Sequence, residues 1–190
     1  MHCPRGFFIP IILDLRTYPD TMVSNMNDQL ATLGWREWVS MPELGLPAIK
    51  AKIDTGARTS ALHAFHVERY RQHGQDWVCF HIHPIQKDLE TVVVGNALLK
   101  DERLVKDSGG HTEMRYVIET PLKVGEIALP IELTLTNRDN MRFRMLIGRQ
   151  AMNNNFVVNP ARSYLQGKKP SKHVYHNQQK PMSVSQEENL

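Results

Sequence analysis

The residues best suited to chemistry in this chain are Asp54, Thr55 and Gly56, which directly follow an apolar stretch typical of a β-strand. An aspartate at a strand end can point its carboxylate into a cleft, a threonine hydroxyl can hydrogen-bond to a partner, and glycine lets another backbone approach closely. An aspartyl hydrolase needs these properties, so we interpret the three residues as catalytic. The alternative is an ordinary turn, in which aspartate accepts local hydrogen bonds and glycine supplies a positive φ.

A second apolar segment, late in the chain, ends in Leu146, Ile147 and Gly148, and a strand-like alternation at 133–136 precedes it. In aspartic peptidases, two apolar residues and a glycine follow Asp-Thr-Gly most of a domain later and pack beneath the catalytic loop. The chain resembles these enzymes in having both features in this order. The resemblance implies that the second segment packs against the loop that contains Asp54.

The wider sequence resembles one bacterial family of retropepsin-like aspartic peptidases, which often carries the label ATP-dependent zinc protease. The segments that show the resemblance are 52–64, 115–120, 141–149 and 158–165, and they lie within residues 35–167. The resemblance implies a retropepsin fold and an endopeptidase activity. Genes of this family are found near ribosomal-protein glutamate ligases, which implies glutamate-rich chains as a substrate.

The chain has one Asp-Thr-Gly motif, whereas an aspartic peptidase needs two carboxylates that share a proton, one acting as base and the other as acid. We therefore expect a homodimer, in which a two-fold axis brings Asp54 and its symmetry mate together to activate a water. The expected partners are a peptide or polypeptide substrate and a second copy of the chain. No cofactor is expected.

Cationic side chains around the matched motifs favour a substrate rich in carboxylates. The alternative is that these arginines lie at strand ends and pair with local acids. Arg58 departs from the viral and cellular retropepsins, in which acidic, small or polar residues follow Asp-Thr-Gly-Ala, although it agrees with the bacterial family. The residues that we predict to bind substrate are Arg58, Thr59, Ser60, His63, Arg115, Arg144 and Arg149.

Two other classes of function are compatible with the residues. A zinc-dependent hydrolase would use histidines, because two histidines two apart on a strand share a face and can hold one metal. The candidates are His63, His66, His81, His83 and His111. The sequence has no His-Glu-x-x-His motif and no glycine-rich phosphate loop, so we predict neither a metal site nor an ATP site. The other class is a non-catalytic peptide-binding or dimerisation module, because a fold does not determine a function.

Short strand patterns separated by turns at regular spacing predict a mainly β fold, namely a closed or nearly closed β-barrel of the retropepsin type with short helical segments. We assign residues 34–167 to this domain, 1–33 to an N-terminal extension and 168–190 to a polar, disordered tail. Residues 59–71 are expected to form a short helix or an irregular excursion. A flap over the cleft is expected at 105–113, which contains a flexible Ser-Gly-Gly turn.

Composition and charge limit the classes of function. At 190 residues, the chain is long enough for one domain plus tails. A hydrophobic content of 41% and a charged content of 23% are ordinary for a soluble protein. The net charge of +3 is too small to predict nucleic-acid binding, and the apolar run at 7–13 is too short to span a membrane. We expect a cytoplasmic protein.

Overall fold

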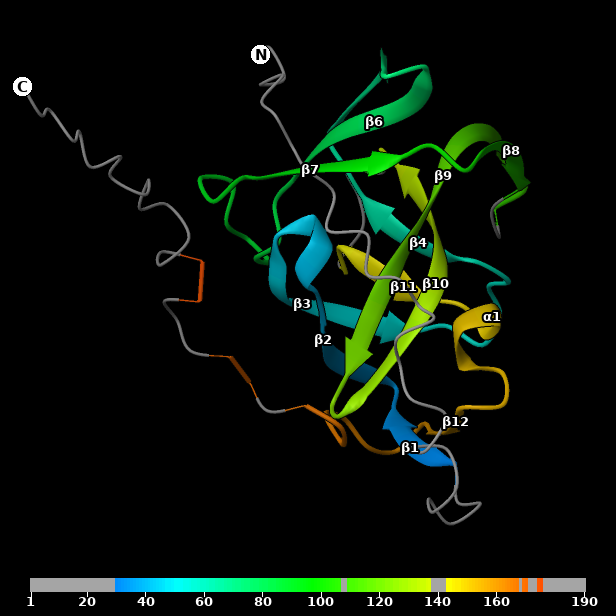
Figure 1. Ribbon diagram of the computed structural model, residues 1–190. Helices are drawn as coiled ribbons and strands as arrows, with labels where there is room; N and C mark the ends of the chain where they lie inside the picture. The colour runs from blue at the N-terminus through cyan, green and yellow to red at the C-terminus, as the bar shows by residue number, and fades with distance from the viewer. Residues whose placement is uncertain (1–29, 107–108, 138–142, 168, 171–173, 176–190) are drawn as a thin grey trace, which may run out of the picture.

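The computed structural model describes residues 30–106, 109–137, 143–167, 169–170 and 174–175. The predicted extension up to residue 29 and most of the predicted tail lie outside the described residues. The described part is mainly β, as predicted (Figure 1), and none of its helices is long and apolar enough to cross a membrane. The elements are β1 (Ala31–Gly34), β2 (Arg36–Met41), the 3-10 helix η3 (Pro42–Leu44), β3 (Leu46–Ile53), β4 (Ser60–His63), β5 (His66–Gln72), β6 (Gln75–Ile82), β7 (Val93–Leu98), β8 (Asp101–Lys106), β9 (Thr112–Val124), β10 (Ile127–Thr136), β11 (Met145–Ile147), α1 (Arg149–Met152) and β12 (Phe156–Asn159).

Seven strands form one sheet in the order β10, β4, β11, β3, β2, β9 and β8, and β10 also pairs with β9. This last pairing closes all of these strands except β8 into a hydrogen-bonded ring (Figure 1). Strands β5, β6 and β7 form a second sheet, and β1 pairs with β12 in a third. One cluster of buried apolar side chains connects the three sheets, with Leu33, Phe80 and Ile118 among its members.

Strand β3 leads to the candidate catalytic residue. Its side chains alternate between two environments, because Ala51 and Ile53 are buried whereas Lys50 and Lys52 are partly exposed. This period of two belongs to a strand with one face packed on a core. The strand pairs antiparallel with β2 and parallel with β11, and Asp54 is the first residue after its end.

The prediction of a helix or irregular excursion at 59–71 is wrong, because this segment forms β4 and most of β5. Every residue of β4 is buried, since the strand lies between β10 and β11 in the ring. Four residues show no readable period, so these two partners decide the conformation. Strand β5 is an edge strand that joins β6 through a tight turn at His73 and Gly74, both of which have positive φ.

Strands β9 and β10 form a hairpin around Gly125 and Glu126. Pro121 and Pro130 lie directly opposite each other, so both missing backbone donors fall on one rung of the ladder. On the other side of β9, β8 pairs with it as far as Lys106 and Thr112. The predicted flap corresponds to the turn end of this β8–β9 hairpin. Residues 107–108 of that turn lie outside the described residues, and the role as a lid stays a prediction.

A buried carboxylate attaches the C-terminal segment of the domain to its first strands. Glu37, on β2, is 0% exposed, and its side chain accepts hydrogen bonds from the N–H groups of Gly34 at 2.6 Å, Leu165 at 2.9 Å and Gln166 at 3.2 Å. Hydrogen bonds to a charged acceptor are strong, and here they offset the cost of removing the charge from water.

The first strand begins ahead of residue 34, where we predict the domain to start. Strand β1 begins at Ala31, pairs in parallel with β12, and contributes the fully buried Leu33 to the core. Residues 31–33 are therefore packed with the rest of the described strands. Their partner strand lies at the far end of the domain, so no local pattern reveals the pairing.

Candidate active site

Asp54 lies where β3 ends, beside the end of β11. The two strands run parallel with Ile53 opposite Ile147, and the Asp54 N–H donates a hydrogen bond to the Ile147 carbonyl at 2.9 Å. Gly148 is the next residue after Ile147. The tertiary structure thus brings together the two motifs that are far apart in the sequence, as their resemblance to aspartic peptidases implies.

The carboxylate of Asp54 is 26% exposed, and its two oxygens have different neighbours. Oδ1 accepts hydrogen bonds from the backbone N–H groups of Gly56 at 3.1 Å and Ala57 at 3.3 Å. Oδ2 lies 3.4 Å from Nζ of Lys52. The aspartate half of the ordinary-turn interpretation therefore describes Oδ1, whereas Gly56 does not adopt a positive φ and Oδ2 takes no part in the turn.

Gly148 packs so closely against the segment after the Asp54 turn that no side chain fits. A Cβ at this position would lie 2.7 Å from the carbonyl carbon and oxygen of Thr59 and 2.8 Å from the carbonyl oxygen of Arg58. The Gly148 N–H also donates to the Ser60 hydroxyl at 3.2 Å in a buried contact. Ser60, which we predict to bind substrate, is 1% exposed and supports the loop from within.

Arg149 holds the Asp54 turn from outside. Its Nη1 donates to the carbonyl of Thr55 at 2.8 Å and to that of Gly56 at 2.9 Å, and its own N–H donates to the Ala57 carbonyl at 2.9 Å. A guanidinium Nη1 carries two hydrogens, and here this one planar nitrogen binds two neighbouring carbonyls. This side chain, which we predict to bind substrate, is thus engaged with the backbone of the turn.

The remaining predicted residues near the turn face outward. Thr55, Gly56 and Arg58 are exposed, and no hydrogen bond or ion pair of the Arg58 side chain is recorded in the described part of the chain. Thr59, which is partly exposed, donates from its hydroxyl to Oε1 of Gln150 at 3.0 Å. These residues form the surface that surrounds the turn.

The three other predicted substrate-binding residues lie in a separate cluster at the far end of β4. His63 is buried there opposite Thr136 of β10, whose hydroxyl donates to Oε2 of Glu113 at 3.0 Å. Arg115 is 7% exposed, and its Nε donates to the same oxygen at 2.8 Å. Arg144 is partly buried, and its carbonyl accepts a hydrogen bond from the His63 N–H at 2.8 Å. The alternative interpretation, pairing with a local acid, thus describes Arg115.

Lys52 is a residue of the site that the sequence-based prediction omitted. It precedes Asp54 by two positions, so the period of a strand places both side chains on one face. That spacing was the available signal, but a lysine at a strand position is also typical of a solvated face. Only the 3.4 Å contact with Asp54 distinguishes the two possibilities.

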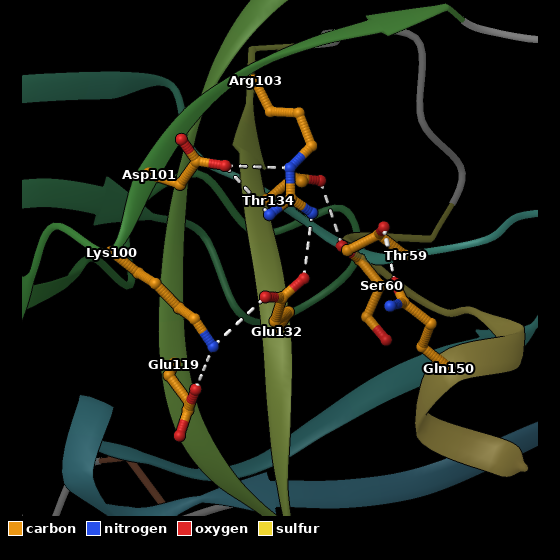
Figure 2. A network of polar contacts seen from close by, with 9 residues as sticks. All are labelled: Thr59, Ser60, Lys100, Asp101, Arg103, Glu119, Glu132, Thr134 and Gln150. Atoms are coloured by element: carbon orange, nitrogen blue, oxygen red, sulfur yellow. Dashed lines mark hydrogen bonds and ion pairs between the residues drawn. The ribbon is translucent and has the colours of Figure 1, made fainter.

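A network of charged residues from β8, β9 and β10 lies beside the site (Figure 2). Glu132 binds Lys100 at 3.2 Å and Arg103 at 2.9 Å, and Lys100 also pairs with Glu119. The hydrogen bond from Arg103, followed by that from Lys100, holds the pKa of Glu132 below its ordinary value. A shallow cavity of about 220 Å³ is lined by Glu119, Pro130, Ile131, Glu132, Gln150 and Ala151. Gln150 connects this cavity to Thr59 and the turn, but both acids of the cavity already have cationic partners.

Histidines do not form a metal site in the described residues. No group of three histidine, cysteine, aspartate or glutamate side chains there is placed to hold a metal ion. The rings of His66 and His81 lie 5.0 Å apart, and His83 stacks on Phe65. Burial, and then the neighbouring His66, lower the pKa of His81 and favour its neutral form. The zinc-hydrolase alternative therefore has no ligand set in this part of the chain.

Comparisons with known proteins agree with this arrangement. Residues 32–169 match the sequence model of the RimB-like family, described as retropepsin-like aspartic endopeptidase RimB. A relative from Desulfotalea psychrophila is 48% identical over 68% of this chain and 28% of its own length, and one from Shewanella pealeana is 44% identical over 76% and 31%. Both are named probable alpha-L-glutamate ligase. This chain spans less than a third of their length.

A solved structure shows a similar fold. It is the crystal structure of Lpg0085, a protein of unknown function from Legionella pneumophila, and it is 25% identical to this chain with a TM-score of 0.60. The match covers 72% of this chain and 98% of the Legionella protein. This arrangement of strands therefore also occurs outside the larger relatives.

Proposed function

Because this chain belongs to the RimB-like family of retropepsin-like aspartic endopeptidases, we propose that it hydrolyses peptide bonds as a homodimer. The observation that supports this most is the position of Asp54. Its carboxylate follows β3, lies against the end of β11, and keeps Oδ2 clear of the turn. A strand end supported on both sides gives a fixed carboxylate, which acid and base catalysis requires.

Catalysis in this proposal takes place between two chains. A two-fold axis places each Asp54 opposite its own copy, and two carboxylates at hydrogen-bond distance share one proton because both cannot ionise easily. The ionised member accepts a proton from a water as the water attacks the amide carbonyl, while the protonated member donates to the carbonyl oxygen. Arg149 would keep the turn in place during this exchange through its bonds to Thr55 and Gly56. No cofactor takes part.

We further propose glutamate-rich chains as the substrate. Exposed Arg58 and the partly exposed Lys52 give the surface around Asp54 a positive character, which favours carboxylates. The names of the Desulfotalea and Shewanella relatives refer to glutamate ligation, and a domain that accompanies such an activity would meet glutamate chains.

The second candidate is a non-catalytic module that binds peptides. It is favoured by one observation, namely that the two relatives bear the name of a ligase and this chain matches less than a third of each. In that case the domain would hold a glutamate chain for a reaction carried out elsewhere in the larger protein. Binding without hydrolysis distinguishes this candidate from the enzyme.

The test is hydrolysis of poly-α-glutamate, followed by mass spectrometry of the products with and without a chelator. The key variant is Asp54→Asn, compared with Asp88→Asn as a matched control. Asp88 also holds a turn with its Oδ1, which accepts from the N–H groups of Glu90 at 2.8 Å and Thr91 at 3.1 Å. Both substitutions remove a carboxylate that holds a turn. A difference in hydrolysis rate between the two variants therefore reports the chemical role of Asp54.

We expect Asp54→Asn to lose at least about a thousandfold in rate while it keeps its dimer in analytical ultracentrifugation, because catalysis depends on an ionisable carboxyl. Asp88→Asn should retain the wild-type rate, and the chelator should have no effect. Undiminished hydrolysis by Asp54→Asn would exclude the aspartic mechanism. Binding of the polymer by the wild type without any cleavage would support the binding module.

A further inference from the structure

Two of the arginines that we predict to bind substrate already have partners. Arg149 donates to the backbone of the Asp54 turn, and Arg115 is 7% exposed and donates to Glu113. Arg115 is too buried to reach a substrate, and Arg149 uses Nη1 for both carbonyls of the turn, which leaves only its Nε and Nη2 for other partners. An acidic residue next to the cleaved bond requires a cation in contact with Asp54, and among the described residues neither these two arginines nor the exposed Arg58 has such a contact.

Lys52 meets this requirement. Residues two apart on a strand share a face, so Lys50, Lys52 and Asp54 all lie on the partly exposed face at the end of β3. Lys50 is engaged elsewhere, because its Nζ donates to Oε1 of Gln86 at 2.8 Å. Lys52 places Nζ 3.4 Å from Oδ2 of Asp54, and its side chain is 45% exposed. Its ammonium group thus lies at the candidate catalytic carboxylate and is open to a ligand.

The contact between Lys52 and Asp54 leaves the ammonium available. It is long and only partly buried, and solvent-accessible pairs of this kind contribute little to stability. An ammonium has three donors, so it can hold Asp54 and a second carboxylate together. Arg36 lies opposite Lys52 on β2, but its Nε donates to the Ser163 hydroxyl at 3.2 Å and its guanidinium lies 4.5 Å from the centre of the Trp35 ring. Arg36 therefore adds positive charge nearby and is itself engaged.

We propose that Lys52 determines specificity by binding the carboxylate of the substrate residue next to the cleaved bond. This inference rests on the proposed function, because the two-fold dimer would place one Lys52 beside each Asp54. The two copies lie on opposite sides of the bond, so an acidic residue is selected at both flanking positions. A substrate carboxylate brought close to Asp54 is repelled by like charge, and Lys52 offsets that repulsion.

The experiment uses four peptides that are identical except at the two residues flanking the cleaved bond. These residues are Glu-Glu, Glu-Gln, Gln-Glu or Gln-Gln, in a common glutamate-containing context. The kcat/KM of each peptide is measured for the wild type, Lys52→Met, Lys52→Arg and the control Lys50→Met. The control removes a lysine from the same strand face, two positions earlier, whose partner is Gln86. Thermal unfolding of each variant shows whether the fold is retained.

We expect the wild type to prefer Glu-Glu over Gln-Gln by about 10- to 100-fold, which is the size of a lost charge-assisted hydrogen bond. Replacing either glutamate alone should lower kcat/KM by a similar factor, because the two-fold axis makes the positions on either side of the bond equivalent. Lys52→Met should lose the preference and Lys52→Arg should restore most of it. Lys50→Met should behave as the wild type. All variants should unfold at nearly the wild-type temperature.

A uniform fall in kcat for all four peptides in Lys52→Met would overturn the proposal, because it would show that Lys52 only orients Asp54. The same conclusion follows if Lys52→Met keeps the wild-type preference. Binding of the peptides to the Asp54→Asn protein, measured by fluorescence anisotropy, separates this inference from the proposed function. If no protein cleaves any peptide, the proposed function fails. The Lys52 inference is then tested by binding alone. It is supported if the tighter binding of Glu-Glu than of Gln-Gln disappears with Lys52→Met, and it is overturned if that difference remains.

Discussion

The two oxygens of the Asp54 carboxylate make different contacts. Oδ1 holds the turn through the N–H groups of Gly56 and Ala57, and Oδ2 lies at the Lys52 ammonium. Rigid support of one oxygen keeps the other in a defined place, which is what a carboxylate must have to transfer protons at a fixed distance. The neighbours Gly148 and Arg149 give this turn its support from inside and outside.

Gly148→Ala should test the inner support. The added Cβ would meet the Thr59 carbonyl at 2.7 Å, and this backbone can yield only by shifting the segment that follows the turn. We expect a loss of about 1–3 kcal/mol in the free energy of unfolding, as for overpacking in a core. Urea unfolding measures the loss, and hydrolysis should fall with it. Wild-type stability in this variant would mean that the close contact does not hold the turn.

Arg149→Lys should test the outer support. Lysine keeps the charge but lacks the planar guanidinium whose Nη1 donates to both the Thr55 and the Gly56 carbonyls. If Arg149 positions the turn, kcat should fall by about tenfold with little change in KM, because the contact acts through Asp54. Steady-state kinetics on poly-α-glutamate provide the measurement. A rise in KM at constant kcat would instead assign Arg149 to substrate binding, as the sequence suggests.

At the scale of elements, the site depends on three strands that meet side by side. Strand β3 positions Asp54, β11 positions Gly148, and β4 brings Ser60 under both through its place between β10 and β11. On the adjoining face, β8, β9 and β10 are connected by the network around Glu132 (Figure 2). This network stabilises the base of the hairpin in which we predict the flap.

Glu132→Gln should lower stability in a way that depends on pH. Arg103 and Lys100 hold the pKa of Glu132 below its ordinary value of 4.5. A lowered folded-state pKa stabilises the fold at pH values above the ordinary pKa. This contribution disappears as the pH falls through the folded-state pKa. We expect the variant to lose about 1 kcal/mol of unfolding free energy at pH 7, since the group is partly exposed.

Chemical denaturation of the wild type and Glu132→Gln between pH 7 and pH 2 provides the measurement, and the two curves should converge at the acid end. Glu126→Gln is the control, because Glu126 is exposed in the β9–β10 turn and has no recorded ion pair among the described residues. A difference that persists at the lowest pH would show that Glu132 acts through packing and not through charge.

For the whole molecule, activity should depend on the association of two chains. The proposed dyad has one Asp54 from each copy, so specific activity should fall when the protein is diluted below its dimer dissociation constant. Co-refolding wild type with an equal amount of Asp54→Asn should leave about half of the activity per wild-type chain, because half of the partners then lack an ionisable group. Assays across a dilution series, with sedimentation in parallel, provide the measurement. Activity per wild-type chain that is independent of both mixing and dilution would show that one chain is sufficient.

By itself, the sequence determined the features that depend on neighbouring residues. The period of two in β3 and the turn residues after it located Asp54 at a strand end, and the glycine-terminated apolar segment located Gly148. Only the tertiary structure decided that β4 is a strand and that Arg149 holds the turn, since both depend on partners distant in the sequence. A four-residue segment or a single arginine has no local signal strong enough to choose between partners. In the folded ring of strands, the neighbouring strands determine where each of them lies.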